Sequence, residues 1–94
     1  MASQKKSKTK QKAPKWFKGM IYTQGETVTN PFSGESYELN ALELSIYDFI
    51  MGSQMVIERM GWFNPNTAKA QQDMSKALNW FRNNNPEAYY VLLD

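Results

Sequence analysis

The stretch from residue 40 to residue 61, NALELSIYDFIMGSQMVIERMG, decides the fold of this 94-residue chain. Asn40 is a preferred N-cap residue, and Glu43 lies three positions further on, where its side chain can bond back to the cap in a capping box. Gly61 supplies the backbone freedom that the end of a helix requires. These signals predict one long helix over residues 41–60.

Two apolar stripes run along this predicted helix when successive residues are placed 100° apart. The first stripe is predicted to face the core and consists of Leu42, Ile46, Phe49, Ile50, Val56, Ile57 and Met60. The opposite stripe consists of Leu44, Tyr47, Met51 and Met55. A helix of this kind must be covered on both sides. Other parts of the chain are the favoured cover, and a partner or a second copy is the alternative, because methionine suits adaptable binding surfaces.

The segment before this helix has the composition of short strands. Residues 20–23 and 27–29 are β-branched or aromatic and flank Gly25, which is predicted to supply the positive φ of a tight turn. Asn30-Pro31-Phe32-Ser33-Gly34 is typical of a second turn, and residues 36–39 follow as a third strand. We therefore expect a short antiparallel β-meander.

Two further helices are predicted after residue 61. Asn64-Pro65 and Asn66-Thr67 are overlapping start signals, and an apolar stripe follows at Ala70, Met74, Ala77, Leu78 and Phe81. Asn85-Pro86 repeats the start signal before the apolar residues 88–93, which should dock as a short helix. The fold class is therefore α+β: a short antiparallel β-meander followed by a long helix and two shorter helices.

Charge divides the chain into two parts. Residues 1–18 contain seven lysines and no acid, whereas residues 19–94 contain four basic and nine acidic residues, a net charge of −5. A lysine run cannot bury apolar surface, so we expect residues 1–14, called here the basic arm, to be disordered. Residues 15–94 are predicted to form a single small α+β domain, with Pro14 at the boundary.

The basic arm is a solvating tail, a nucleic-acid contact, or a contact to an acidic protein surface, an anionic membrane or the chain's own acidic domain. Lysine favours point-charge contacts with phosphates over base reading, so binding should be weakly sequence-selective and steeply salt-dependent. Trp16, between two lysines, stacks on bases or anchors the arm to the domain. The candidate residues for this contact are Lys5, Lys6, Lys8, Lys10, Lys12, Lys15, Trp16 and Lys18.

The residue inventory argues against an enzyme. The chain has no cysteine and no histidine, which removes disulfides, thiolate-held zinc and the usual neutral-pH proton shuttle. No phosphate-binding loop is present, and the carboxylates are not spaced as a catalytic pair. We therefore predict no catalytic residue, no metal and no cofactor. There is no apolar run that could span a bilayer and no secretory signal, so a cytoplasmic location and no membrane partner are expected.

Aromatic residues make up 14% of the chain, and most of them should fill the core of so small a domain. Tryptophan, tyrosine and methionine are also enriched at protein interfaces, so one exposed aromatic patch is expected. The candidate partner interface consists of Leu44, Tyr47, Met51, Met55, Trp62 and Trp80.

Several short motifs between Val28 and Asp94 carry a family resemblance: Thr29-Asn30-Pro31-Phe32-Ser33-Gly34, Glu38-Leu39-Asn40-Ala41-Leu42-Glu43, Tyr47-Asp48-Phe49-Ile50, Trp80-Phe81-Arg82 and Leu92-Leu93-Asp94. In these motifs the chain resembles small uncharacterised proteins of tailed bacteriophages of aquatic bacteria. The resemblance implies a phage gene product that acts in the host cytoplasm or is packaged in the virion. It assigns no role to any residue.

Together these observations predict a non-enzymatic accessory binding protein. It would dock on a host or phage macromolecule, with the basic arm contacting nucleic-acid phosphates or an acidic surface. One alternative is a self-assembling structural protein of the virion, in which the stripe from Leu44 to Met55 pairs two copies as a homo-oligomer. Another is an inhibitor that occludes a host enzyme through exposed aromatic residues, with the arm steering association by charge.

Overall fold

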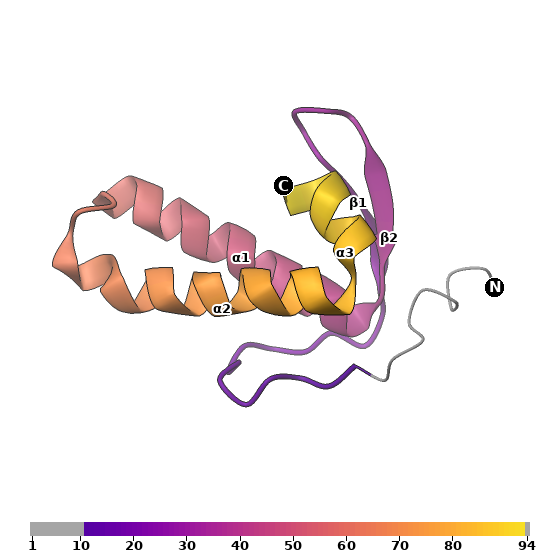
Figure 1. Ribbon diagram of the computed structural model, residues 1–94, viewed down its shortest axis with the longest axis horizontal. Coiled ribbons are helices and arrows are strands. Elements are labelled where there is room, and N and C mark those ends of the chain that lie inside the picture. Colours follow the sequence, from indigo (N-terminus) through magenta and orange to yellow (C-terminus); the bar gives the residue numbers. More distant parts are fainter. Residues whose placement is uncertain (1–10, 94) are drawn as a thin grey trace.

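The computed structural model describes residues 11–93 of the chain. The sheet consists of β1 (Glu26–Thr29) and β2 (Ser36–Leu39), and the helices are α1 (Ala41–Met60), the 3₁₀ turn η2 (Pro65–Thr67), α2 (Ala68–Asn84), α3 (Pro86–Ala88) and the π-helical turn η3 (Tyr89–Leu93). The helices α1 and α2 run antiparallel along the length of the molecule, and the sheet, α3 and η3 gather at one end of this pair (Figure 1). The predicted α+β class and element order are confirmed.

The N-terminus of α1 begins with the predicted capping box. The side chain of Asn40 accepts a hydrogen bond from the backbone N–H of Glu43 at 2.8 Å, and the Glu43 carboxylate accepts one from the backbone N–H of Asn40 at 3.0 Å. At the other end Gly61 has a φ of 104°, and its N–H donates to the carbonyl of Ile57 at 2.7 Å. Both predicted ends of the helix are confirmed.

The sheet has two strands, whereas a three-stranded meander was predicted. Val28 pairs with Tyr37 in the antiparallel register, and the connecting turn holds Gly34 at a φ of 79°. Residues 20–23 form no strand because α1 uses their polar groups instead. The N–H of Tyr22 donates to Oγ of Ser45 at 2.8 Å, and the Tyr22 hydroxyl donates to Asp48 at 2.6 Å.

Gly25 is required for a different reason from the one predicted. Among the described glycines, positive φ angles occur at Gly34 and Gly61, so the predicted turn geometry at Gly25 is wrong. A Cβ atom on Gly25 would lie 1.9 Å from the carbonyl oxygen of Leu39. The backbone of residue 25 therefore passes too close to the end of β2 for any side chain to fit.

The core lies between the first half of α1, the second half of α2 and the elements gathered at that end. Ile46, Ile50 and Ile57 of the predicted core stripe are buried, as are Ala77 and Phe81 of α2. Val56 and Met60 belong to the same predicted stripe but are exposed, although Ile57 beside Val56 is buried, because fewer elements pack on this half of α1. The prediction is therefore correct for Ile46, Ile50 and Ile57 and wrong for Val56 and Met60.

The C-terminal segment docks as the sequence predicts. The side chain of Asn85 accepts a hydrogen bond from the N–H of Ala88 at 3.2 Å and so caps α3. Ala88 and Leu92 are buried in the core, and the side-chain amide of Asn30 donates to the carbonyl of Val91 at 2.9 Å. This last bond joins the β1–β2 turn to η3.

Candidate functional site

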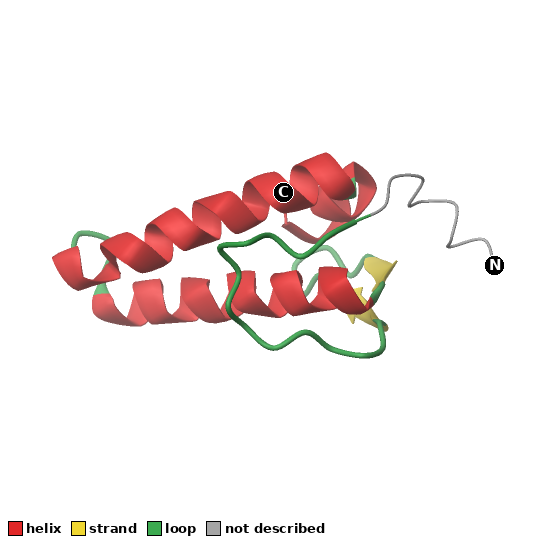
Figure 2. Cartoon of the chain, turned by 90° about the horizontal axis from the view of Figure 1, so that it is seen from below, coloured by secondary structure: helices red, strands yellow, loops and turns green. Residues whose placement is uncertain are grey.

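Residues 11–19, called here the anchored segment, lie across the pair of long helices. Figure 2 shows the loop that precedes β1 passing across this face. Trp16 and Phe17 pack on Phe49 of α1 with ring centroids 5.9 and 5.5 Å from it, and Phe17 is buried. Aromatic pairs at such distances stabilise a fold beyond the area they bury. The anchoring role, one of the two alternatives for Trp16, is what the structure shows.

Polar contacts hold the chain to the domain from Gln11 onward. The Gln11 side-chain amide donates to Glu43 Oε2 at 2.8 Å and accepts from the side-chain amide of Asn40 at 3.0 Å. The indole N–H of Trp80 on α2 donates to the carbonyl of Lys12 at 3.3 Å. The last residues of the basic arm, from Gln11 to Pro14, therefore contact the helices before the predicted boundary is reached.

Glu43 is the centre of this contact. Its side chain is only 3% exposed, and its carboxylate accepts hydrogen bonds from the Asn40 backbone and from the side-chain amides of Gln11 and Asn85, the last at 2.9 Å. A buried charge is costly unless hydrogen-bond donors surround it, and three donors do so here. The sequence predicted the cap at Glu43 but contained no local signal for the bonds that Gln11 and Asn85 donate to its carboxylate. Glu43 joins the anchored segment, α1 and the start of α3.

Three of the candidate lysines belong to the anchored segment. Lys12, Lys15 and Lys18 are all exposed, and Lys76, also exposed, lies one helical turn before Trp80 on α2. The one ion pair among residues 11–93 joins Lys69 to Asp73 at 2.9 Å. None of the four lysines therefore forms an ion pair with a carboxylate of the described residues. Lys5, Lys6, Lys8 and Lys10 lie outside the described residues.

The candidate partner interface is not a single surface. Leu44 and Tyr47 are 8% and 7% exposed, so their assignment to an interface must be corrected: they belong to the core. Met51 is half-buried, while Met55 is 63% exposed. The predicted stripe is therefore covered by the chain itself along the first half of α1 and open only beyond it.

The two tryptophans of that candidate set lie apart. Trp80 is half-buried and is bonded to the anchored segment, whereas Trp62 is 46% exposed in the loop between α1 and α2. Its neighbour Phe63 is fully exposed. The loop therefore has the exposed aromatic pair that composition predicted without locating. Phe63 was not among the candidates, although its adjacency to Trp62 was the available signal.

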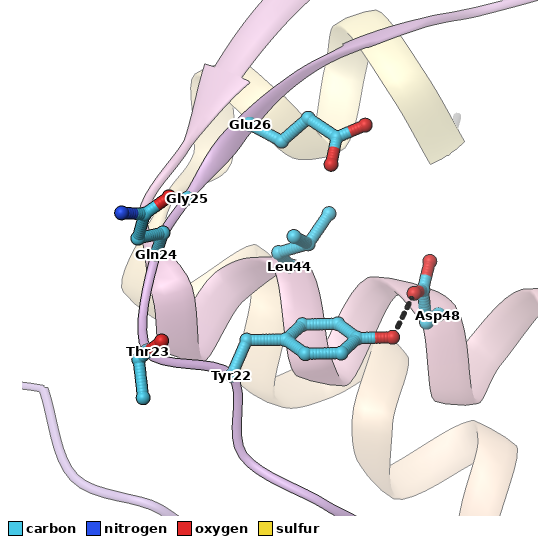
Figure 3. Close-up of a pocket in the computed structure, with 7 residues that line it drawn as sticks. All are labelled: Tyr22, Thr23, Gln24, Gly25, Glu26, Leu44 and Asp48. Carbon is cyan, nitrogen blue, oxygen red and sulfur yellow. Dashed lines mark hydrogen bonds between the residues drawn. The ribbon is translucent and has the colours of Figure 1, made fainter.

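A pocket of about 350 Å³ lies between α1 and the segment from residue 22 to residue 26. Figure 3 shows the Tyr22 ring, the Leu44 side chain and the carboxylates of Glu26 and Asp48 around one space. The hydrogen bond from the Tyr22 hydroxyl to Asp48, and then the charges of Asp48 and Glu26, raise the pKa of Tyr22. The pocket is therefore negatively charged, and no sequence pattern indicated it.

The other perturbed groups in the described residues are also tyrosines. Burial, then the hydrogen bond to Glu87 at 2.8 Å, raises the pKa of Tyr37, and burial followed by the charge of Asp48 raises that of Tyr47. Each tyrosine therefore stays protonated well into the alkaline range. Within residues 11–93 no three acidic side chains come together as a metal site would require. No helix of that range has the length and apolarity needed to cross a membrane.

Comparison of the chain with protein-family models, with curated proteins and with solved structures finds no match. The resemblance to bacteriophage proteins therefore stays a prediction.

Proposed function

We propose that this protein is a non-enzymatic accessory binding protein whose lysine-rich N-terminal region contacts nucleic-acid phosphates. The observation that carries the proposal is the anchored segment, which presents Lys12, Lys15 and Lys18 to solvent on a backbone fixed by aromatic packing and hydrogen bonds. A fixed backbone loses less conformational entropy on binding than a free tail does.

Charge separation within the chain supports this proposal. The seven lysines of residues 1–18 precede residues 19–94, whose net charge is −5, and Lys12, Lys15 and Lys18 have no carboxylate partner among the described residues. Phosphate contacts by lysine release counterions, which makes the affinity depend strongly on salt and weakly on sequence. The predicted phage setting, in the host cytoplasm or the virion, is compatible with such a ligand and belongs to the same proposal.

The competing functions make different predictions. An acidic protein partner would be captured equally with and without nuclease treatment. A self-assembling virion protein would use the exposed residues at the far end of the helix pair, among them Met55, Trp62 and Phe63, and would form oligomers at high concentration. The same exposed aromatics are the surface an inhibitor of a host enzyme would use.

The test is the salt dependence of binding to a labelled oligonucleotide, single-stranded and duplex, by the full chain. We expect the logarithm of the association constant to fall linearly with the logarithm of salt concentration, by about 0.7 per phosphate contact on single strands and about 0.9 on duplex. Changing Lys5, Lys6, Lys8, Lys10 and Lys12 to alanine should weaken binding and reduce that slope.

The matched control is Lys69→Ala, because Lys69 is exposed but paired with Asp73 on the part of α2 remote from the anchored segment. It should leave both affinity and slope nearly unchanged. Equal affinity at low and high salt, or equal losses in the control and the five-lysine variant, would contradict the proposal. A pull-down from bacterial lysate with and without nuclease then separates nucleic acid from an acidic protein.

A further inference from the structure

The pocket beside α1 is acidic and mostly polar, with Leu44 and the Tyr22 ring as its apolar contacts. Its lining includes the carboxylates of Glu26 and Asp48, the ring of Tyr22 and the side chain of Leu44. In Figure 3 the Glu26 carboxylate lies above Leu44 and the Asp48 carboxylate to its right, both bordering the same space, whereas the side chains of Thr23 and Gln24 point away from it. The volume of about 350 Å³ is within the range of small-molecule sites.

The groups that border this space select against most ligands. Two carboxylates repel an anion. A metal ion needs more oxygen ligands than remain, because one Asp48 oxygen already accepts the Tyr22 hydroxyl at 2.6 Å. A cation with an apolar stem is favoured, because its charge meets the carboxylates while its methylene groups contact Leu44 and the tyrosine ring.

We propose that this pocket binds an alkylammonium group, with Glu26 and Asp48 receiving the charge and Tyr22 and Leu44 contacting the carbon chain. The Tyr22 hydroxyl donates to Asp48 at 2.6 Å and so holds that carboxylate at the edge of the pocket. The inference is independent of the proposed nucleic-acid contact, because it uses acidic residues and a cationic ligand.

Two sources can supply such a group: a free amine, or a lysine side chain. The test uses the ¹⁵N-labelled full chain at low salt and follows the backbone amides of residues 22–26, 44 and 48 during addition of n-butylammonium. 1-Butanol, which has the same carbon chain without the charge, is the ligand control. We expect saturable shifts of these amides with n-butylammonium and none with 1-butanol.

The variant that tests the assignment is Glu26→Gln combined with Asp48→Asn, which preserves the shape of both side chains and an acceptor for Tyr22. We expect the affinity for n-butylammonium to fall roughly tenfold, as the loss of two exposed ion pairs implies. The matched control is Glu35→Gln with Glu38→Gln, two exposed acids of the same hairpin that do not line the pocket, and it should bind normally.

Two further samples show whether the alkylammonium group comes from a free amine or from a lysine side chain. Binding of Nα-acetyl-lysine amide with similar shifts supports a lysine side chain as the ligand, and binding of n-butylammonium alone supports a free amine. The second sample is a variant in which Lys5, Lys6, Lys8 and Lys10 are changed to glutamine. If its pocket amides differ from those of the unmodified chain before any amine is added, the chain's own lysines occupy the pocket. Equal shifts with 1-butanol, or unchanged affinity in the Glu26/Asp48 variant, overturn the proposal.

Discussion

The two ends of the α1–α2 pair differ in how the same two helices are covered. At the end where α1 begins, the anchored segment, the sheet, α3 and η3 all pack on the pair, and Leu39, Ile46 and Phe81 are almost completely buried. At the far end, where α1 turns into α2, the short turn η2 is the element that lies beside the helices, and Ile57 and Thr67 are buried there. Met55 and Phe63 are exposed there.

This difference shows that helix pattern alone does not decide what is buried. Leu44 and Met55 belong to the same predicted stripe of α1, yet Leu44 is buried and Met55 is exposed. The cover comes from parts of the chain distant in sequence, and all of them gather at one end. Stability should therefore be concentrated at the covered end, and the far end should be free to contact other molecules.

The largest expected effect is at Phe81, which is completely buried at the covered end. Phe81→Ala should lower the free energy of unfolding by about 3–5 kcal/mol, because it leaves a cavity among well-packed side chains. Phe63→Ala, at the fully exposed position of the far end, should change it by less than about 0.5 kcal/mol. Urea unfolding followed by circular dichroism measures both, and similar losses would contradict the comparison.

The second effect concerns Glu43, which fixes the covered end by hydrogen bonds. Glu43→Ala removes the half of the capping box that the Glu43 side chain forms, and it leaves the amides of Gln11 and Asn85 without their acceptor. We expect a loss of about 2–4 kcal/mol in the free energy of unfolding, measured by the same urea titration.

Glu58→Ala is the control for this change, since Glu58 is exposed on α1 and accepts a hydrogen bond from Gln54. It should cost less than about 0.5 kcal/mol. A loss at Glu43 no larger than that at Glu58 would mean that the buried contacts of Glu43 contribute nothing to stability.

The helix starts were predictable because their signals are local. Asn40, Asn64 and Asn85 each precede a helical turn and accept a bond from a backbone N–H within three residues, as their spacing predicted. The lysine run was equally visible, because it depends only on composition. The bond between Gln11 and Glu43 was not predictable, because two polar side chains 32 residues apart leave no periodic pattern.

The third strand was predicted wrongly and the pocket was not predicted, and the two failures have a related reason. Residues 20–23 have strand composition, but Tyr22 bonds to Ser45 and Asp48 of α1, a competition that strand propensity does not include. The pocket exists only because that loop docks on α1 and brings Glu26 near Asp48. Any site built by docking of two distant segments is hidden until the docking is known.

The smallest expected effect concerns Tyr37, whose hydroxyl donates to Glu87 and so joins β2 to α3. Tyr37→Phe should lower the free energy of unfolding by about 1 kcal/mol at pH 7. The pKa of Tyr37 is raised in the folded chain above the ordinary value of 10.0. Above pH 10 the unfolded chain therefore releases this proton more readily than the folded one, and stability falls as pH rises.

Urea titrations from pH 8.5 to 11 should show this decline in the unmodified chain and a shallower one in Tyr37→Phe. The lysines, which titrate in the same range, are common to both proteins, so the difference between the two curves isolates Tyr37. Parallel curves would show that the Tyr37–Glu87 hydrogen bond does not contribute to the pH dependence of the free energy of unfolding.

The contacts of the anchored segment also fix an order of events during synthesis. Lys12 accepts its hydrogen bond from Trp80, 68 residues later, and Gln11 shares the Glu43 carboxylate with Asn85. The ribosome synthesises residues 11 and 12 before residues 80–85, so these contacts form only after residues 80–85 have emerged. Contacts between such distant residues form late. On a translating ribosome, the lysine-rich N-terminal region is therefore exposed to its surroundings before the domain exists to hold it.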